Sequence, residues 1–208
     1  MLLHPSIHDD PRTALVSDSV TRDGRECVRC QCQSFLKTDA ELLRLVQEGK
    51  LSHSGTTAMA AAVLGRRLLV AHVGDCRAIL CRNGRAVNLT TDHRPSTPSE
   101  RSRIESMGGY VDPEGYLNGD LQVSRALGDF HYTELKNEDG TGCLSAEPDV
   151  VEQMVEMNDE FVVLTSDGAL DVLLPNQVTR IARNSLIEHN SPEKAAAAVV
   201  MMTSEVGE

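Results

Sequence analysis

The sequence has no tryptophan, and it has only three phenylalanines and three tyrosines. Its hydrophobic core must therefore be built mainly from aliphatic side chains. Basic residues are also scarce: 20 Lys and Arg stand against 31 Asp and Glu, which gives a formal net charge of −11 at pH 7. Because nucleic-acid binding needs a basic surface, this balance argues against a nucleic-acid partner.

Long apolar runs are missing as well. None approaches the ~20 residues that cross a bilayer, and the first ten residues lack the basic start and apolar centre of a secretory signal. We therefore expect an intracellular protein of the cytoplasm, the nucleus or both, with no membrane partner.

The six cysteines are expected to be reduced in that compartment. Cys27, Cys30 and Cys32 form a C-x-x-C-x-C cluster, but a zinc site would need a second ligand pair at suitable spacing. We interpret the cluster as incidental cysteines in a loose segment. Cys76 and Cys81 are expected on strands, as small buried hydrophobic residues.

The 208 residues fit one domain. Residues 1–33 contain scattered charges and no periodicity, which predicts an irregular segment, and residues 34–208 carry the domain. Thr38-x-x-Glu41 is a capping-box pattern, which predicts a short helix that ends near Glu48.

Strands are then grouped together and flanked by helices, which indicates an α+β layered domain. The predicted elements are a β-meander over 56–90 with an Asn83-Gly84 turn, a helix from Thr97 to about Gly108, loops with short strands over 110–147, strands near 149–156 and 160–166, and helices near 176–189 and after Ser191.

Two predicted strands end in an acidic turn. The apolar run from Phe161 stops at Asp167-Gly168, with Asp171 four residues further on, and the run that ends at Val73 leads into Gly74-Asp75. Buried strands that deliver carboxylates through glycine turns favour a site for a hard cation. The alternatives are ordinary turn aspartates at 75 and 167 and a helix N-cap at 171.

These turns belong to a longer ordered series of motifs. The series comprises Ser54-Gly55-Thr56-Thr57-Ala58, Val73-Gly74-Asp75-Cys76-Arg77-Ala78, Asp92-His93-Arg94-Pro95, Glu100 to Ile104 with Glu105, Gly108-Gly109, Ser124-Arg125-Ala126-Leu127-Gly128-Asp129, Ser145-Ala146-Glu147-Pro148 and Ser166-Asp167-Gly168. In order and spacing it resembles the metal-dependent protein phosphatases of type 2C, and looks most like plant members. The resemblance covers about Ser34 to the C-terminus. It implies a partial type-2C phosphatase fold, a β-sandwich of two antiparallel sheets flanked by helices.

The family pattern contains three further motifs that do not occur in residues 1–208. They are an early acidic segment with a phosphate-binding arginine, an Asp-Gly-His-Gly-Gly motif whose aspartate bridges two metals, and an Asp-Asn pair near the C-terminus. Relative to that pattern the chain is truncated at both ends, and we expect its first and last strands to be missing. Neighbours such as Leu68–Val73 are then expected to have open edges and uncovered apolar faces.

The resemblance assigns metal ligands residue by residue. Asp167 matches a ligand of the binuclear pair, and Asp75 and Asp171 match positions of a weaker third metal. Mg²⁺ or Mn²⁺ is the implied cofactor, and weak binding is expected because two metals need bridging oxygens to hold them together. Arg125 supports either a phosphate or the metal carboxylates, or else makes a structural salt bridge to Asp129 or another acid, and we favour the structural role.

No catalytic residue is assigned. His72 is expected to be a packed or partly exposed strand histidine, and His93 to belong to a structural loop. The family function is hydrolysis of phosphoserine or phosphothreonine in proteins, and we expect this chain to be a protein phosphatase whose activity is weak or lost. The alternatives are a pseudophosphatase that binds phosphorylated proteins or protein kinases, and a fragment with no independent role.

Overall fold

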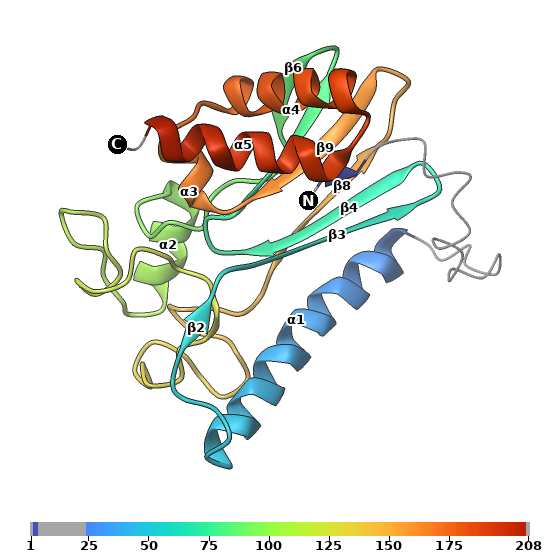
Figure 1. Ribbon diagram of the computed structural model, residues 1–208. Helices are drawn as coiled ribbons and strands as arrows, with labels where there is room; N and C mark the ends of the chain where they lie inside the picture. The colour runs from blue at the N-terminus through green and yellow to red at the C-terminus, as the bar shows by residue number, and fades with distance from the viewer. Residues whose placement is uncertain (1, 4–23, 207–208) are drawn as a thin grey trace.

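The computed structural model describes residues 2–3 and 24–206 (Figure 1). In chain order its elements are β1 (Leu2–Leu3), α1 (Gly24–Gln47), β2 (Gly55–Thr56), β3 (Ala58–Leu64), β4 (Arg67–Val73), β5 (Arg77–Arg82), β6 (Arg85–Asn88), α2 (Pro98–Ser106), β7 (Leu127–Gly128), β8 (Asp149–Met154), β9 (Asp159–Thr165), α3 (Asp167–Leu170), α4 (Pro175–His189) and α5 (Pro192–Val206).

The strands form two main sheets and a small ribbon. One sheet has the order β1-β9-β5-β6, the other has the order β3-β4-β8, and β2 pairs with β7. Every pairing between these strands is antiparallel. Figure 1 shows α4 and α5 over the sheet that contains β9, and α1 on the opposite side of the molecule, below β3 and β4. This is the predicted α+β arrangement of antiparallel sheets flanked by helices.

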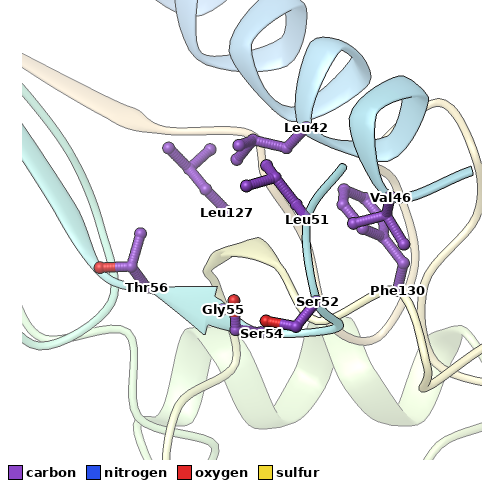
Figure 2. A pocket seen from close by; sticks show the side chains of 9 residues that line it. All are labelled: Leu42, Val46, Leu51, Ser52, Ser54, Gly55, Thr56, Leu127 and Phe130. Atoms are coloured by element: carbon purple, nitrogen blue, oxygen red, sulfur yellow. The ribbon is translucent and has the colours of Figure 1, made fainter. Parts of the chain in front are cut away.

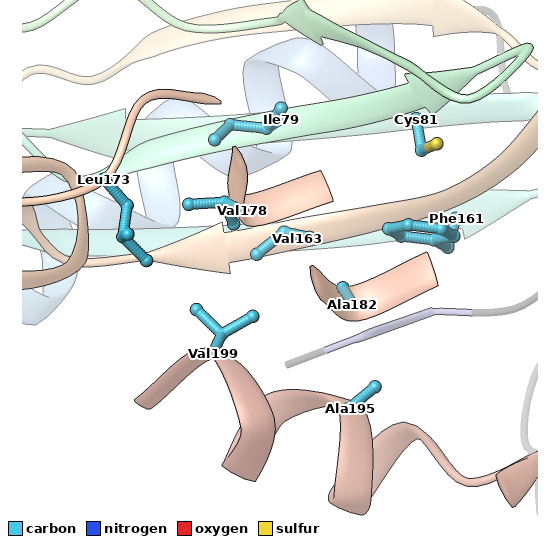
Figure 3. Close-up of a cluster of buried hydrophobic side chains, with 9 residues drawn as sticks. All are labelled: Ile79, Cys81, Phe161, Val163, Leu173, Val178, Ala182, Ala195 and Val199. Atoms are coloured by element: carbon cyan, nitrogen blue, oxygen red, sulfur yellow. The ribbon is translucent and has the colours of Figure 1, made fainter. Parts of the chain in front are cut away.

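The core between the two sheets is aliphatic, as the composition predicts. Leu68 and Val70 of β4 pack with Ala78 and Leu80 of β5 and with Val162 of β9. Because successive side chains of a strand point to opposite faces, the alternate residues of β5 and β9 face outward. There they join α4 and α5 in a second buried cluster of Ile79, Cys81, Phe161, Val163, Leu173, Val178, Ala182, Ala195 and Val199 (Figure 3).

Helix α1 covers the other outer face. Phe35 of α1 packs in one buried cluster with Ala71 and Val73 of β4. The strand β4 itself lies between β3 and β8, with a continuous register on both sides. Leu68–Val73 are between 0% and 2% exposed. The prediction of open edges and uncovered apolar faces for this strand is therefore wrong, because β8 closes one edge, β3 closes the other, and α1 covers the face.

Helix α1 also begins earlier than expected. Gly24–Gln33 are helical, so the prediction of an irregular segment is wrong for them, and the cysteine cluster lies on a helix. Residues 1 and 4–23 lie outside the described part of the chain. No capping box forms inside this helix, because the Thr38 hydroxyl donates to the Ser34 carbonyl oxygen at 2.8 Å. The predicted end near Glu48 is confirmed, and Gly49 follows with φ +70°.

The predicted meander is two hairpins in different sheets. Gly65 and Asn83-Gly84 turn the chain within each hairpin, and all three have positive φ. Between them, the turn at Gly74 carries the chain from the β3-β4-β8 sheet into the other sheet. The remaining strands and helices lie close to their predicted positions, except that the short helix α3 was not predicted.

The two cysteines expected to be buried are buried. Cys81 lies on β5, whereas Cys76 lies in the turn just before it. Burial raises the pKa of each thiol to about 11. Both thiols are therefore protonated at neutral pH and act as small hydrophobic groups.

Candidate functional site

The strand-end aspartates share one region of the structure. Asp75 follows β4 and is 7% exposed, whereas Asp167 follows β9 and is exposed at the start of α3. Burial, and then the negative charge of Asp167, raise the pKa of Asp75. Two carboxylates from different sheets therefore lie close enough to repel each other. Asp171 is the C-cap residue of α3, so the alternative of an N-cap at this position is wrong.

The donor set does not fit a binuclear metal centre. Such a centre needs several oxygen ligands that converge on each ion. In the described part of the chain, the one group of three His, Cys, Asp or Glu residues whose ligand atoms all lie within 4.8 Å is His72, His93 and Asp149. Asp75, Asp167 and Asp171 do not form such a group. The carboxylate of Asp75 instead accepts a hydrogen bond from Arg94, with Nη2 3.3 Å from Oδ2.

The loop that carries Arg94 is clamped to the Gly74–Asp75 turn. The His93 backbone amide donates to the Gly74 carbonyl oxygen at 3.0 Å, and the Gly74 amide donates to Nδ1 of His93 at 3.1 Å. Beside this contact, Arg77 donates two hydrogen bonds to the carboxylate of Asp92, at 2.5 and 2.6 Å. The position of Asp75 is thus set by contacts between two segments almost 20 residues apart.

The ligand atoms of His72, His93 and Asp149 lie close enough together for a metal site, but the orientation of the two rings does not suit metal coordination. The two imidazole rings stack with centroids 4.3 Å apart and an interplanar angle of 10°. An ion cannot lie in both ring planes at once when the planes are parallel. Nδ1 of His93 is also a hydrogen-bond acceptor, so a neutral ring carries its hydrogen on Nε2, the atom 3.2 Å from Asp149. Coordination through Nε2 would remove that hydrogen.

The two histidines are therefore packed groups, as expected. His72 and His93 are 1% and 2% exposed. Burial, and then the neighbouring His93, lower the pKa of His72 to about 4. His72 is accordingly neutral at physiological pH, and it leaves a buried Nδ1 without a hydrogen-bond partner.

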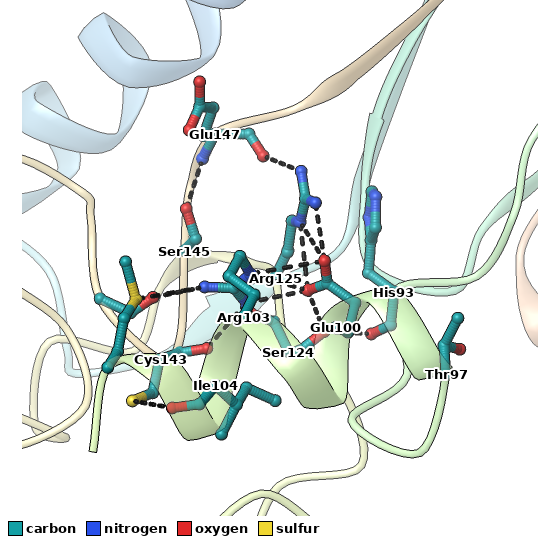
Figure 4. A network of polar contacts seen from close by, with 12 residues as sticks. His93, Thr97, Glu100, Arg103, Ile104, Ser124, Arg125, Cys143, Ser145 and Glu147 are labelled. Atoms are coloured by element: carbon teal, nitrogen blue, oxygen red, sulfur yellow. Dashed lines mark hydrogen bonds and ion pairs between the residues drawn. The ribbon is translucent and has the colours of Figure 1, made fainter. Parts of the chain in front are cut away.

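Arg125 belongs to a buried ion network centred on Glu100 of helix α2 (Figure 4). Arg125 and Arg103 reach the carboxylate with Nη2 at 2.7 and 2.8 Å, and the hydroxyl of Ser124 donates to it at 2.6 Å. Burial raises the pKa of Glu100, but these hydrogen bonds outweigh it and lower the pKa to about 2. The carboxylate is therefore ionised at every physiological pH.

The remaining contacts of Arg125 are also structural. Its Nη1 lies 2.9 Å from Oδ1 of Asp149 and 3.0 Å from the carbonyl oxygen of Glu147. Contact with His93, and then the charge of Arg125, hold the pKa of Asp149 well below its usual range. The favoured structural role of Arg125 thus has a geometric basis, with Glu100 and Asp149 as its partners in place of Asp129.

A cavity of about 120 Å³ lies elsewhere, between the end of α1 and the β2-β7 ribbon (Figure 2). It is lined by Leu42, Val46, Leu51, Ser52, Ser54, Gly55, Thr56, Leu127 and Phe130. None of these is a carboxylate, a histidine or a basic residue. The cavity therefore offers no acid, base or metal ligand, and the candidate site remains at the Gly74–Asp75 turn and its neighbours.

Sequence reasoning did not find the partners of these aspartates. Asp92, Arg77 and Arg94 all stand within the quoted motifs, but their spacing alone does not show which side chains meet. Glu100 stands in the motif series and at the predicted helix start, but neither pattern indicates that its side chain contacts Arg125 and Ser124.

The comparisons with known proteins agree with this fold. The sequence profile described as Protein phosphatase 2C matches residues 4–207. The chain belongs to the protein phosphatase 2C family. None of the helices in the described residues combines the length and the apolar character that a membrane crossing requires.

Similar curated proteins come from plants. The chain is 46% identical over 168 residues to a protein of Oryza sativa subsp. japonica named "Probable protein phosphatase 2C 57", which covers 81% of this chain and 46% of the relative. It is 44% identical over 177 residues to "Probable protein phosphatase 2C 27" of Arabidopsis thaliana, covering 84% of this chain and 45% of the relative. The chain thus spans about half the length of the curated relatives that it matches.

Solved structures share the fold. A serine-threonine phosphatase 2C from Toxoplasma gondii superposes with a TM-score of 0.71 at 25% identity, covering 86% of this chain and 61% of that one. A Caenorhabditis elegans sex-determining protein superposes with a TM-score of 0.68 at 25% identity, covering 97% of this chain and 46% of that one.

Proposed function

We propose that this chain is a protein serine/threonine phosphatase of the 2C type, directed at phosphoserine and phosphothreonine in intracellular proteins, whose own hydrolysis is weak or lost. One observation supports the proposed weakness or loss of hydrolysis. Asp75, Asp167 and Asp171 do not form a converging group of ligands among the described residues, and Asp75 is paired with Arg94.

The chemistry explains why this pairing matters. When bound, Mg²⁺ or Mn²⁺ would lower the pKa of a coordinated water and clamp the phosphoryl oxygens. Asp167 offers an exposed carboxylate, and Asp75 offers a buried one that already has a guanidinium partner. A single exposed carboxylate binds these ions weakly, because Mg²⁺ dehydrates reluctantly and demands near-octahedral geometry.

A second candidate, binding without hydrolysis, rests on a different observation. The loops over residues 92–147 are held by the buried network around Glu100, which does not involve Asp75 or Asp167. A surface built on these loops can persist without metal. In that case the chain acts as a pseudophosphatase that binds phosphorylated proteins or protein kinases.

Hydrolysis of a phosphothreonine peptide by the purified chain tests the first proposal. The reactions contain Mn²⁺, Mg²⁺ or excess chelator, and a cooperative thermal transition shows that the chain is folded. We expect no rate above the chelator control. A metal-dependent rate that D167A abolishes, and that E114Q at an exposed glutamate leaves unchanged, would contradict the loss of activity.

Capture experiments separate the second candidate from the first. We expect immobilised folded chain to retain phosphoproteins or kinases in the presence of chelator, and to retain fewer when Glu100 is replaced by glutamine. A chain that folds cooperatively but retains no more phosphoprotein than a column without protein would exclude the binding role.

A further inference from the structure

Arg94 is the cationic partner of the Asp75 carboxylate. Its Nη2 lies 3.3 Å from Oδ2 of Asp75, and its Nε lies 3.4 Å from Oδ2 of Asp92. Within the described residues, no other Lys, Arg or His nitrogen is recorded within ion-pair distance of Asp75. The Asp75 side chain is 8% exposed, whereas that of Arg94 is 40% exposed.

The backbone places Arg94 at this carboxylate. The preceding residue, His93, is held to Gly74 by the two hydrogen bonds described above, one in each direction. Arg94 therefore leaves the loop directly beside the residue that follows Gly74. Arg77 cannot take its place, because its guanidinium is held in two short hydrogen bonds to Asp92.

The four side chains balance one another in charge. Asp75 and Asp92 contribute two negative charges, and Arg77 and Arg94 contribute two positive ones. A buried carboxylate close to another carboxylate needs a compensating cation, since burial and repulsion both disfavour its charge. Arg94 supplies that cation from within the chain.

We propose that Arg94 is a built-in competitor of divalent cations, so that a metal ion binds Asp75 only when the guanidinium has moved away. This inference rests on the proposed function, because that function makes Asp75 a cation ligand. Two features favour it: the ion pair between Arg94 and a buried carboxylate, and the moderate exposure of the Arg94 side chain, which leaves it room to move into solvent. A divalent ion at Asp75 would otherwise lie within a few ångströms of a positive charge, and that repulsion weakens its binding.

Mn²⁺ titrations of charge-altering variants test the inference without any substrate. Free Mn²⁺ is followed by electron paramagnetic resonance, and the binding position by paramagnetic broadening of the Gly74 and Asp75 amide resonances. For R94Q we expect Mn²⁺ to bind about three- to tenfold more tightly than to the wild type. R94K retains a cation and should stay within about twofold of the wild type.

Two further variants assign the effect to this pair. R101Q removes an arginine that is as moderately exposed as Arg94 and pairs with Glu105 on the same helix, and it should leave Mn²⁺ affinity unchanged. D75N combined with R94Q should abolish the increase in Mn²⁺ affinity that R94Q produces alone. Cooperative melting of each variant confirms that it is folded.

Equal or weaker Mn²⁺ binding by R94Q, including no binding by either protein, would overturn the inference. A gain that survives D75N would overturn it as well. These outcomes are independent of phosphatase activity: hydrolysis by the wild-type chain would contradict the proposed loss of activity while leaving the ratio of the affinities unaffected.

Discussion

Lys136 and Asp39 form an ion pair whose side chains are 0% and 1% exposed, with Nζ 2.8 Å from Oδ1. The ammonium group also donates to the carbonyl oxygens of Ala126 and Gly128 at 2.9 and 2.8 Å. The same carboxylate oxygen accepts the Gly128 amide at 2.7 Å. The pair thus fixes helix α1 to the β7 segment, and it connects residues far apart in the sequence.

Replacing Lys136 by methionine should destabilise the fold strongly. The change leaves the carboxylate of Asp39 buried without its cation, and losing one partner of a buried pair costs about 3–5 kcal/mol. The free energy of unfolding from urea denaturation measures this. K37M is the matched control, since Lys37 lies exposed on α1, the helix that carries Asp39. We expect K37M to lower the free energy of unfolding by less than about 0.5 kcal/mol. A K136M protein as stable as K37M would show that the pair does not hold α1 in place.

The buried carboxylate of Glu100 should make stability depend on pH in acid. Its pKa falls from 4.5 to about 2 on folding, so its stabilising contribution is complete above pH 4.5 and is lost as the pH falls towards 2. We expect E100Q to be less stable than the wild type at pH 7, by about 2–3 kcal/mol, and the difference to shrink in acid.

Urea denaturation between pH 7 and pH 2 gives this difference directly. E105Q on the same helix provides the control, because Glu105 is exposed, and its stability should run parallel to that of the wild type. A constant difference between E100Q and the wild type across the whole range would mean that the carboxylate is not held ionised by its arginine partners.

Alanine at Gly74 should be more costly than alanine at Gly65. Both glycines have positive φ, at +91° and +59°, so each substitution carries about 1–2 kcal/mol of backbone strain. Only at Gly74 would the new Cβ also meet Thr57, at 2.2 Å from its Cγ2, whereas the Cβ at Gly65 meets nothing within 4 Å. We expect the free energy of unfolding to fall by at least about 1 kcal/mol more in G74A than in G65A. Equal losses of stability in G74A and G65A, measured by thermal or urea unfolding, would show that the Thr57 side chain moves aside at no cost.

The regular elements from β3 to α5 could largely be predicted, because their boundaries carry local signals. Asn83-Gly84 and Gly65 mark hairpins, and Pro98 and Pro192 stand at helix starts. The beginning of α1 had no such signal. Its first ten residues mix polar side chains with cysteines and a valine, and a helix of that kind depends on tertiary packing further along, such as that of Phe35 against β4.

The candidate site was only partly predictable. Asp75 lies in the turn that follows β4, as the pattern of apolar runs and glycines indicated, whereas Asp167 begins the short helix α3 and Asp171 is its C-cap residue. The ion pairs around the site and in the core could not be predicted. Arg77 meets Asp92, and Lys136 meets Asp39, only through the tertiary fold. The open edge expected for β4 was wrong for the same reason: strand order is set by long-range pairing that leaves no mark in the local sequence.

The number of Mn²⁺ ions retained by the folded chain tests the central claim most directly. Equilibrium dialysis followed by metal analysis gives this number for the wild type and for D167A. We predict no pair of tightly bound ions in either protein, because the described aspartates do not converge on a shared position. Two ions retained together by the wild type, and lost in D167A, would contradict the claim and establish a working binuclear centre.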